Sequence, residues 1–229
     1  MEPSIGVIGV GWVGEQIKKY FEVLRKYRLG VDLHTYDSNP KKCTGDIQKA
    51  KIVFIAVPTP TSGEFGACDT SIVDSAVNLI KGEKIVVIKS TVPPRTTEQL
   101  QIKYPQHKLL FNPEFLTEKN AWNDFCYPSR QIVGFTERSR DAALMVLELL
   151  PKARFSSPAP MHVPPLWITA TEAELSKLAC NCFLSIKVVT SVMIAEIAEK
   201  IGAQYEVIRE VIGADERIGA SHLDITHGG

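Results

Sequence analysis

The glycine-rich segment from Gly9 to Gly14 limits the folds open to this chain more than any other feature of the sequence. It follows a short apolar run, Ile5 to Gly9, and opens a segment with helical spacing, Val13 to Tyr27. In a strand-turn-helix unit, such glycines permit a tight turn, a close approach of backbone N–H groups to a pyrophosphate, and close packing of helix on strand. The residues expected to bind a dinucleotide here are Gly9, Gly11, Trp12, Val13 and Gly14.

A carboxylate follows the next apolar run, Leu33 to Tyr36. Asp37 lies 23 residues after Gly14, near the position of an acid that hydrogen-bonds a ribose 2′-hydroxyl in dinucleotide-binding domains. No arginine adjoins it to receive a 2′-phosphate, which favours NAD over NADP as the cofactor. The alternative is that the glycines serve only a strand-to-helix turn and Asp37 is a surface acid. The joint occurrence of both signals favours the cofactor site.

Short apolar runs alternate with longer segments of helical spacing through the first two thirds of the chain. The expected strands are Ile5 to Gly9, Leu33 to Tyr36, Ile52 to Val57, Ile85 to Lys89, Lys108 to Phe111 and Gln131 to Gly134. The expected helices are Val13 to Tyr27, Thr70 to Ile80, Thr96 to Lys103 and Arg138 to Leu150. This order predicts a doubly wound α/β fold of the Rossmann type with a mostly parallel sheet.

Prolines follow Phe155 in quick succession and predict a domain boundary near residue 165. We therefore expect a dinucleotide-binding domain at 1–165 and a helical region at 166–229. Ile168 to Ile201 contains neither Gly nor Pro and has apolar residues at steps of three and four, which predicts one long central helix. At roughly 50 Å, it suits a helix shared between domains or protomers, so a homodimer through this helix is expected. A shorter helix is predicted from Gln204 to Ile212.

Charge and cysteine content exclude several classes of function. Lys plus Arg (26) balances Asp plus Glu (26), so no overall field attracts nucleic acid or an anionic membrane. The N-terminus has neither a basic start nor a long apolar run, which predicts a cytoplasmic protein without a signal peptide or membrane span. The five cysteines are odd in number and form no C-x-x-C pair, so we expect reduced thiols and no metal site.

Two further expected strands end in loops at the edge where open α/β sheets bind their ligands. The strand from Ile52 is followed by Pro58-Thr59-Pro60, and the strand from Ile85 by Ser90-Thr91-Val92-Pro93-Pro94. The prolines hold the loops stiff, and the alternative is that they merely terminate these strands. Ser90 and Thr91 are the better candidates for a functional role.

Several spaced segments resemble the UDP-glucose/GDP-mannose dehydrogenase family and occur in that family's order. They are Val57 to Pro60, Lys89 to Pro94, Asn112-Pro113-Glu114-Phe115-Leu116 with Glu118, Pro128-Ser129-Arg130, Glu174 to Asn181, and Gly213 to Gly219. The resemblance implies the family's NAD-binding domain and part of its central helical domain. The Asn-Pro-Glu-Phe-Leu and Lys-to-Asn segments are much more specific than the glycine fingerprint.

Enzymes of this family oxidise the C6 alcohol of a UDP- or GDP-hexose twice, with two NAD molecules, and form a uronic acid. The resemblance implies that Lys177 stabilises an oxyanion with help from Asn181, and that Glu114 and Glu118 position the hexose or handle water. Thr91 would lie beside the nicotinamide. The other implied cofactor contacts are Pro58, Thr59 and Ser90, and the implied contacts to the nucleotide-sugar substrate are Phe115, Leu116 and Arg217.

The spacing of Glu174, Lys177 and Asn181 supports part of this assignment independently, because steps of three and four place residues on one helix face. A carboxylate, an ammonium and an amide on one face can converge on a ligand. The alternative is a solvated helix face with an ion pair. For Arg217, the alternatives are a contact to a sugar or phosphate across a subunit boundary and a surface arginine in a polar turn.

Some features depart from the family. Its nucleophilic cysteine lies in a Gly-Gly-x-Cys segment a little beyond the Arg-Ile-Gly turn, and the sequence printed here ends at Gly229. We therefore expect a truncated or minimal form, with Cys180 and Cys182 as packing residues. Between Asn39 and Asp46 there is room only for a turn, so the sheet is expected to be trimmed on that side.

Two other classes of function remain open. A β-hydroxyacid dehydrogenase would use Lys177 and Asn181 without a cysteine, although the Asn-Pro-Glu-Phe-Leu segment does not fit that group. A protein without catalytic activity would be a dinucleotide-binding, dimerising module built on the long helix.

Overall fold

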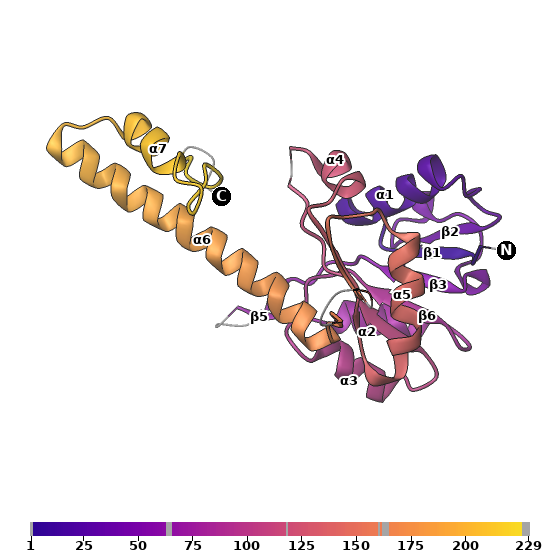
Figure 1. The fold of residues 1–229 in the computed structure, drawn as a ribbon. Coiled ribbons are helices and arrows are strands. Elements are labelled where there is room, and N and C mark those ends of the chain that lie inside the picture. The colour runs from indigo at the N-terminus through magenta and orange to yellow at the C-terminus, as the bar shows by residue number, and fades with distance from the viewer. Residues whose placement is uncertain (1, 63–65, 118, 160, 162–164, 226–229) are drawn as a thin grey trace. The chain divides into compact units, whose positions relative to one another are not determined.

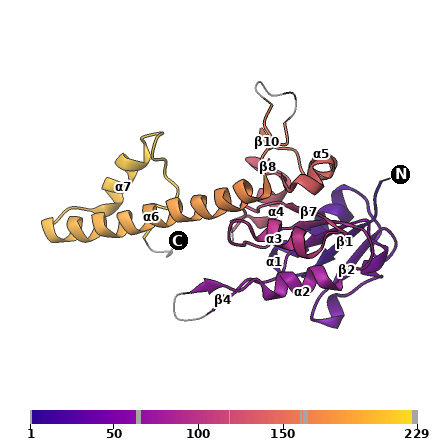
Figure 2. The ribbon, with the colours of Figure 1, turned by 90° about the horizontal axis from the view of Figure 1, so that it is seen from below.

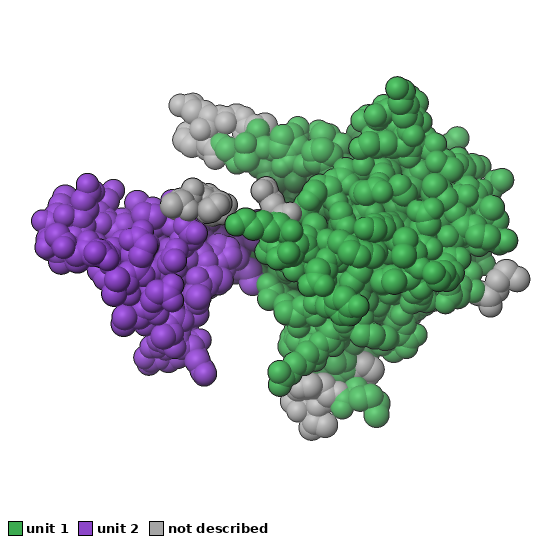
Figure 3. Space-filling model, turned by 90° about the horizontal axis from the view of Figure 1, so that it is seen from above, with its two compact units in different colours: residues 1–177 green, residues 178–229 purple. Residues whose placement is uncertain are grey.

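The computed structural model describes residues 2–62, 66–117, 119–159, 161 and 165–225. The chain divides into two compact units, residues 1–177 and 178–229 (Figure 3). The predicted domain boundary near residue 165 is not tested by this division and stays a prediction. Each unit is described by itself below.

A six-stranded sheet forms the centre of the first unit (Figure 1). Its order is β2-β1-β3-β6-β7-β9, with the first five strands parallel and β9 antiparallel to β7. The strands are β1 (Ile5–Ile8), β2 (Leu33–Tyr36), β3 (Ile52–Ile55), β6 (Ile85–Ile88), β7 (Lys108–Phe111) and β9 (Gly134–Phe135). The predicted Rossmann-type, mostly parallel α/β fold is confirmed.

The five parallel strands are in register, so they all end at one edge of the sheet. Ile8 pairs with both Tyr36 and Ile55, and the alignment continues through Ile88 to Phe111. The chain runs from β1 out to β2 and back to β3 on the other side of β1, which makes the β1–β3 gap the switch point of the fold. Ligands of open α/β sheets bind outside the carboxyl ends of the strands at such a point.

Helices cover both faces of the sheet (Figure 2). On one face, α1 (Trp12–Lys19), α4 (Ala121–Cys126) and α5 (Arg140–Leu149) bury a core with Val7, Phe54 and Val87. On the other face, α2 (Ser71–Leu79), α3 (Thr96–Lys103) and the first turn of α6 (Ala170–Ile201) pack on Val53 and Val86. Neighbouring strand residues point to opposite faces, which explains why these strands read as continuous apolar runs.

The edge beside β2 is short, as the sequence predicted. The connection after β2 contains only a 3-10 turn at Pro40–Lys42, and Thr44 pairs with Thr35 alongside β2. Asn39 begins the turn by accepting a hydrogen bond from the backbone N–H of Lys41 (3.1 Å). No further strand lies outside β2 in the described part of the chain.

Two predicted elements differ from the structure. The predicted strand from Gln131 to Gly134 is divided into β8 (Arg130–Ile132) and β9, because β8 pairs in parallel with β10 (Phe155–Ser157), in a segment predicted to be a linker. The predicted helix from Val13 to Tyr27 is α-helical only to Lys19 and continues as a π-helical turn at Tyr20–Leu24. The wider turn accompanies the burial of two consecutive aromatic side chains, Tyr20 and Phe21.

A small hairpin of β4 (Thr61–Ser62) and β5 (Ala67–Cys68) was not predicted.

The second unit contains the remainder of α6 and the helix α7 (Tyr205–Gly213). The Tyr205 hydroxyl donates to the Leu223 carbonyl oxygen (2.6 Å), and Lys187 Nζ donates to the Ile218 carbonyl oxygen (2.9 Å). These bonds fold the segment after α7 back within the unit. The predicted long helix is confirmed as α6, which begins two residues later than expected and ends at Ile201 as expected.

The turn between β1 and α1 allows a paired test of packing. A Cβ on Gly14 would lie 1.8 Å from the Gly9 carbonyl oxygen, whereas a Cβ on Gly11 would meet no atom within 4 Å. We expect Gly14→Ala to lower the free energy of unfolding by about 3 kcal/mol and Gly11→Ala to change it by less than about 0.5 kcal/mol. Chemical denaturation of both variants measures the difference, and equal stabilities would contradict the close packing.

Candidate functional site

The glycine turn at the carboxyl end of β1 leads into a helix start that no side chain caps. Gly9 has φ +85°, a conformation that side chains rarely adopt, and its N–H donates to the Tyr36 carbonyl oxygen (2.9 Å). Gly11 precedes α1, and no side chain caps this helix end. Trp12 is exposed at the first turn, while Val13 packs against the core. Free N–H groups at a helix start, beside open space at Gly11, suit a pyrophosphate.

Asp37 stands beside this turn at the end of β2. Its Oδ2 accepts from the Val10 N–H (2.7 Å) and its Oδ1 from the Asn39 N–H (2.8 Å). The hydrogen bond from Asn39 contributes most to lowering the pKa of Asp37, so the carboxylate stays ionised. Each oxygen keeps a lone pair for a ribose hydroxyl.

Lys42 is a neighbour of this turn that sequence reasoning did not find. Its Nζ donates to the Val10 carbonyl oxygen (2.8 Å), so a cation lies close to Asp37. The short 3-10 turn after Asn39 brings Lys42 back to the glycine turn. The signal in the sequence was the shortness of this connection, which keeps Lys42 near the glycine turn.

The loops after β3 and β6 are fixed to each other. The Ser90 hydroxyl donates to the Val57 carbonyl oxygen (2.7 Å) and accepts from the Val57 N–H (3.0 Å). The Thr59 hydroxyl donates to the Thr91 carbonyl oxygen (2.8 Å). Ser90 and Thr59 thus hold these loops at the β1–β3 switch point, and Pro58 is exposed there. The Thr91 side chain is partly exposed in the same loop.

A largely buried ion pair lies after β7. Lys177 Nζ, near the start of α6, is 3.3 Å from Glu114 Oε1, and the two side chains are 9% and 15% exposed. Glu114 Oε2 also accepts from the Leu116 N–H (2.8 Å), which fixes the carboxylate. The Phe115 ring lies under two cations, with the Arg130 guanidinium 3.7 Å and Lys177 Nζ 5.3 Å from its centroid. The structure therefore brings Glu114, Phe115 and Lys177 together, while Leu116 packs on the core.

Glu174 has a different role from the one that helical spacing predicted. Its side chain is fully buried, and its carboxylate accepts from the Arg95 N–H (2.6 Å), the Thr97 N–H (2.8 Å) and the Thr97 hydroxyl (2.6 Å). These groups form the N-terminus of α3, so Glu174 caps α3 rather than facing a ligand. Burial raises the pKa of Glu174, and the hydrogen bonds from Thr97 and Arg95 oppose this shift.

Three predicted site residues fall outside the described part of the first unit. Asn181 belongs to the second unit, where its side chain is exposed, four residues after Lys177 in the same helix. Arg217 also lies in the second unit and forms an ion pair with Asp215 (2.6 Å). Glu118 is outside the residues that the structure describes. The proposed roles of all three stay predictions.

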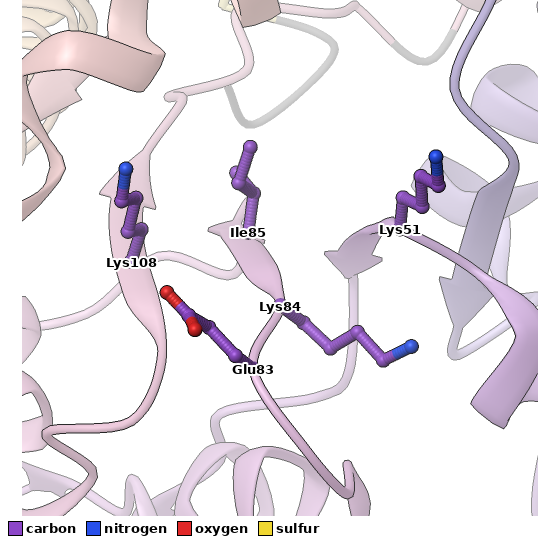
Figure 4. Close-up of a pocket in the computed structure, with 5 residues that line it drawn as sticks. All are labelled: Lys51, Glu83, Lys84, Ile85 and Lys108. Carbon is purple, nitrogen blue, oxygen red and sulfur yellow. The ribbon is translucent and has the colours of Figure 1, made fainter.

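A hollow of about 260 Å³ lies at the opposite edge of the sheet (Figure 4). Its lining residues are Lys51, Glu83, Lys84, Ile85 and Lys108, which surround the amino ends of β3, β6 and β7. Lys84 Nζ donates to the Gln48 carbonyl oxygen (2.8 Å), and Lys108 is paired with Asp141 (2.5 Å). Because the lysine side chains splay apart and two of them already have partners, this hollow is not the candidate site.

The fold and the site together define a dinucleotide-binding domain of the Rossmann type with a charged pair at its ligand edge. Residues 38–149 match the model of the UDP-glucose/GDP-mannose dehydrogenase family, NAD binding domain, and residues 171–229 match the model of that family's central domain. The chain belongs to the UDP-glucose/GDP-mannose dehydrogenase family. The predicted family is confirmed, and with it NAD as the cofactor of that family's dehydrogenases.

Similar proteins agree with this assignment. A UDP-glucose 6-dehydrogenase of Rickettsia typhi is 33% identical over 189 residues, which cover 79% of this chain and 42% of the relative. UDP-glucose 6-dehydrogenase 3 of Oryza sativa subsp. japonica is 32% identical, with 84% and 44% covered. The structure of a UDP-glucose dehydrogenase from the archaeon Pyrobaculum islandicum has a TM-score of 0.81 at 25% identity and covers 97% of this chain and 59% of that one. The chain thus spans about two fifths of the length of the curated relatives it matches.

The Glu174 cap predicts a large effect of one exchange on stability. Glu174→Ala leaves the N–H groups of Arg95 and Thr97 without their acceptor, which costs about 1–3 kcal/mol in the free energy of unfolding. Glu148→Ala, which removes an exposed carboxylate from α5, is the matched control and is expected to change stability by less than about 0.5 kcal/mol. Urea denaturation checks both variants, and similar midpoints would refute the cap.

Proposed function

We propose that this chain binds NAD and serves a nucleotide-sugar dehydrogenase that oxidises the C6 alcohol of a UDP- or GDP-hexose to a uronic acid. The observation that carries the proposal is the Glu114–Lys177 pair, which follows β7 at the same sheet edge as the glycine turn. A fixed ammonium beside a hexose C6 oxygen stabilises negative charge on that oxygen as hydride leaves. The relatives named UDP-glucose 6-dehydrogenase support the substrate class.

Each part of the carboxyl edge has a role in this proposal. The N-terminus of α1 and Gly11 hold the pyrophosphate, and Asp37 binds the adenosine ribose. Thr91 lies beside the nicotinamide, with Pro58, Thr59 and Ser90 shaping the loop under it. Bound NAD supplies the hydride acceptor. Glu114 orients the Lys177 ammonium and the sugar. Phe115 and Leu116 line the substrate site.

The proposed reaction needs more than these residues. Asn181, Glu118 and Arg217 are proposed to contact the sugar oxyanion, water and a sugar or phosphate group, respectively. A thiol nucleophile for the second oxidation is assigned to none of the five cysteines, and none of them forms a disulfide bond in the described part of the chain. A β-hydroxyacid dehydrogenase has less support, because the family match includes the region of the Asn112 to Leu116 segment.

The test is a titration of the protein with NAD and with NADP by calorimetry, followed by NAD with UDP-glucose, UDP-N-acetylmannosamine or GDP-mannose. We expect tighter binding of NAD than of NADP and an absorbance of reduced cofactor with one sugar nucleotide. Asp37→Ala is expected to weaken NAD binding about 10- to 100-fold, because it removes charged hydrogen bonds to the ribose. Glu83→Ala, at the opposite edge, should have no effect. Absence of NAD binding to the wild-type protein would refute the proposal.

We further propose that the protein is a homodimer through α6. Within the second unit, a run of large apolar side chains is exposed along this helix at steps of three and four. They are Phe183, Ile186, Val189, Met193 and Ile197, each at least 57% exposed. By length and composition alone, α6 would also be apolar enough to cross a membrane, a property shared by helices that pair with other helices. A second copy of this face buries the run symmetrically.

Sedimentation velocity tests the dimer. The wild-type protein is expected to sediment as a dimer and Ile186→Glu as a monomer, because a charge in the apolar contact is left unpaired. Ile102→Glu alters an even more exposed isoleucine on α3 and should leave the dimer intact. A monomeric wild-type protein that floats with phosphatidylcholine vesicles would instead identify α6 as a membrane helix.

A further inference from the structure

Lys89 is a buried lysine close to the proposed site for which the proposed function has no role. It follows β6 directly and is 4% exposed. Its Nζ donates to Asn112 Oδ1 (2.8 Å) and lies 5.8 Å from the centroid of the Phe125 ring. None of the ion pairs among the described residues includes Lys89. An ammonium buried without an adjoining carboxylate destabilises a fold, so its presence calls for a functional explanation.

Asn112 connects Lys89 to the Glu114 segment. The Asn112 side chain is fully buried, and its Nδ2 donates to Gln131 Oε1 (2.9 Å) and to the Ile132 carbonyl oxygen (2.6 Å). Both amide hydrogens are therefore used, which turns Oδ1 toward Lys89. Since Asn112 begins the segment that carries Glu114, the Lys89–Asn112 bond anchors the carboxylate two residues further on.

The charges near Lys89 form a group of three. Burial lowers the pKa of Lys89 to about 8; the Glu114 carboxylate opposes this shift and the Lys177 ammonium adds to it. Glu114 and Lys177 alone form a neutral pair. With Lys89 protonated, the group has a net charge of +1, so the ammonium of Lys177 is not fully compensated by Glu114.

We propose that Lys89 is a positioning residue that anchors Glu114 through Asn112 and keeps this three-charge group positive, so that Lys177 can stabilise an oxyanion. The inference rests on the proposed function for its chemistry. In a site of low polarity, a second cation has a larger effect on a developing negative charge than it would in water. The lysine side chain itself touches no substrate atom in this proposal.

A dependence of the rate on pH follows from the charge of Lys89. Lys89 is a cation below its pKa and neutral above it, so the net charge of the group falls from +1 to 0 as the pH rises through about 8. The charged groups that face it are Glu114 and Lys177, and its other neighbours, Asn112 and Phe125, are neutral. We expect kcat to fall on this alkaline side while the KM for NAD stays constant.

The test compares Lys89→Met with Lys108→Met in the whole protein. Lys89→Met keeps the length of the side chain without the charge, and we expect kcat to drop about tenfold or more, the KM for NAD to change less than twofold, and the decline near pH 8 to disappear. Lys108→Met removes a surface lysine from β7 and should leave kcat and its pH profile unchanged. A pH profile of Lys89→Met identical to that of the wild type would overturn the proposal.

A crystal structure tests the anchoring of Glu114 without activity, and NMR tests the electrostatic role where the variant does not fold. In a crystal structure of Lys89→Met, Glu114 and Lys177 are expected to separate beyond ion-pair distance; an unchanged pair would overturn the positioning role. If this variant does not fold, NMR of the lysine side chains in the wild-type protein follows the titration of Lys89, which is expected near pH 8. A kcat that stays constant through that titration would overturn the electrostatic role. A wild-type protein that reduces no NAD with any sugar nucleotide refutes the proposed function, and the crystal structure still tests the anchoring of Glu114.

Discussion

The common register of five parallel strands is the constraint on which the candidate site depends. Because Ile8, Tyr36, Ile55, Ile88 and Phe111 are aligned across the sheet, the residues that follow them emerge at one edge. Segments far apart in sequence thus become neighbours: the glycine turn, Asp37, the Ser90 loop and the Asn112 segment. Hydrogen bonds between the loops, such as that of Ser90 with Val57, then fix their relative positions. The sheet provides the edge, and the loops provide the chemistry.

A second constraint places the ammonium of Lys177. The buried carboxylate of Glu174 holds the first turn of α6 against the N-terminus of α3, and Lys177 follows one turn later, beside Glu114. A capping interaction therefore has a consequence for the site, because it sets the direction from which the lysine approaches the sheet edge. Within the first unit, the stability of α3 and the geometry of the charged pair are coupled through one helix turn, because Glu174 and Lys177 are three positions apart.

The family assignment and the local geometry agree, but each provides information that the other does not. The family match identifies a NAD-binding domain and a central domain, and the geometry shows which side chains of this chain meet. The positions of Lys89 and Lys42 are known only from the geometry. Lys89 is buried under the Glu114 segment, and the Lys42 side chain bonds to the glycine turn. The spacing of residues in the sequence did not predict either position, because Lys89 was expected at the end of a strand and Lys42 in a polar turn.

The sequence by itself determined the parallel α/β fold, the glycine turn with Asp37 and the long helix, because these features follow from local periodicity and from backbone conformations that only certain residues adopt. It did not determine that Gln131 to Gly134 divides between two sheets, since the partner strand at Phe155–Ser157 is distant in the chain. It also misplaced Glu174, whose helical spacing fits a ligand-facing side chain as well as a cap. Only the tertiary structure decided these cases, because burial and hydrogen-bond partners come from segments that no local pattern contains.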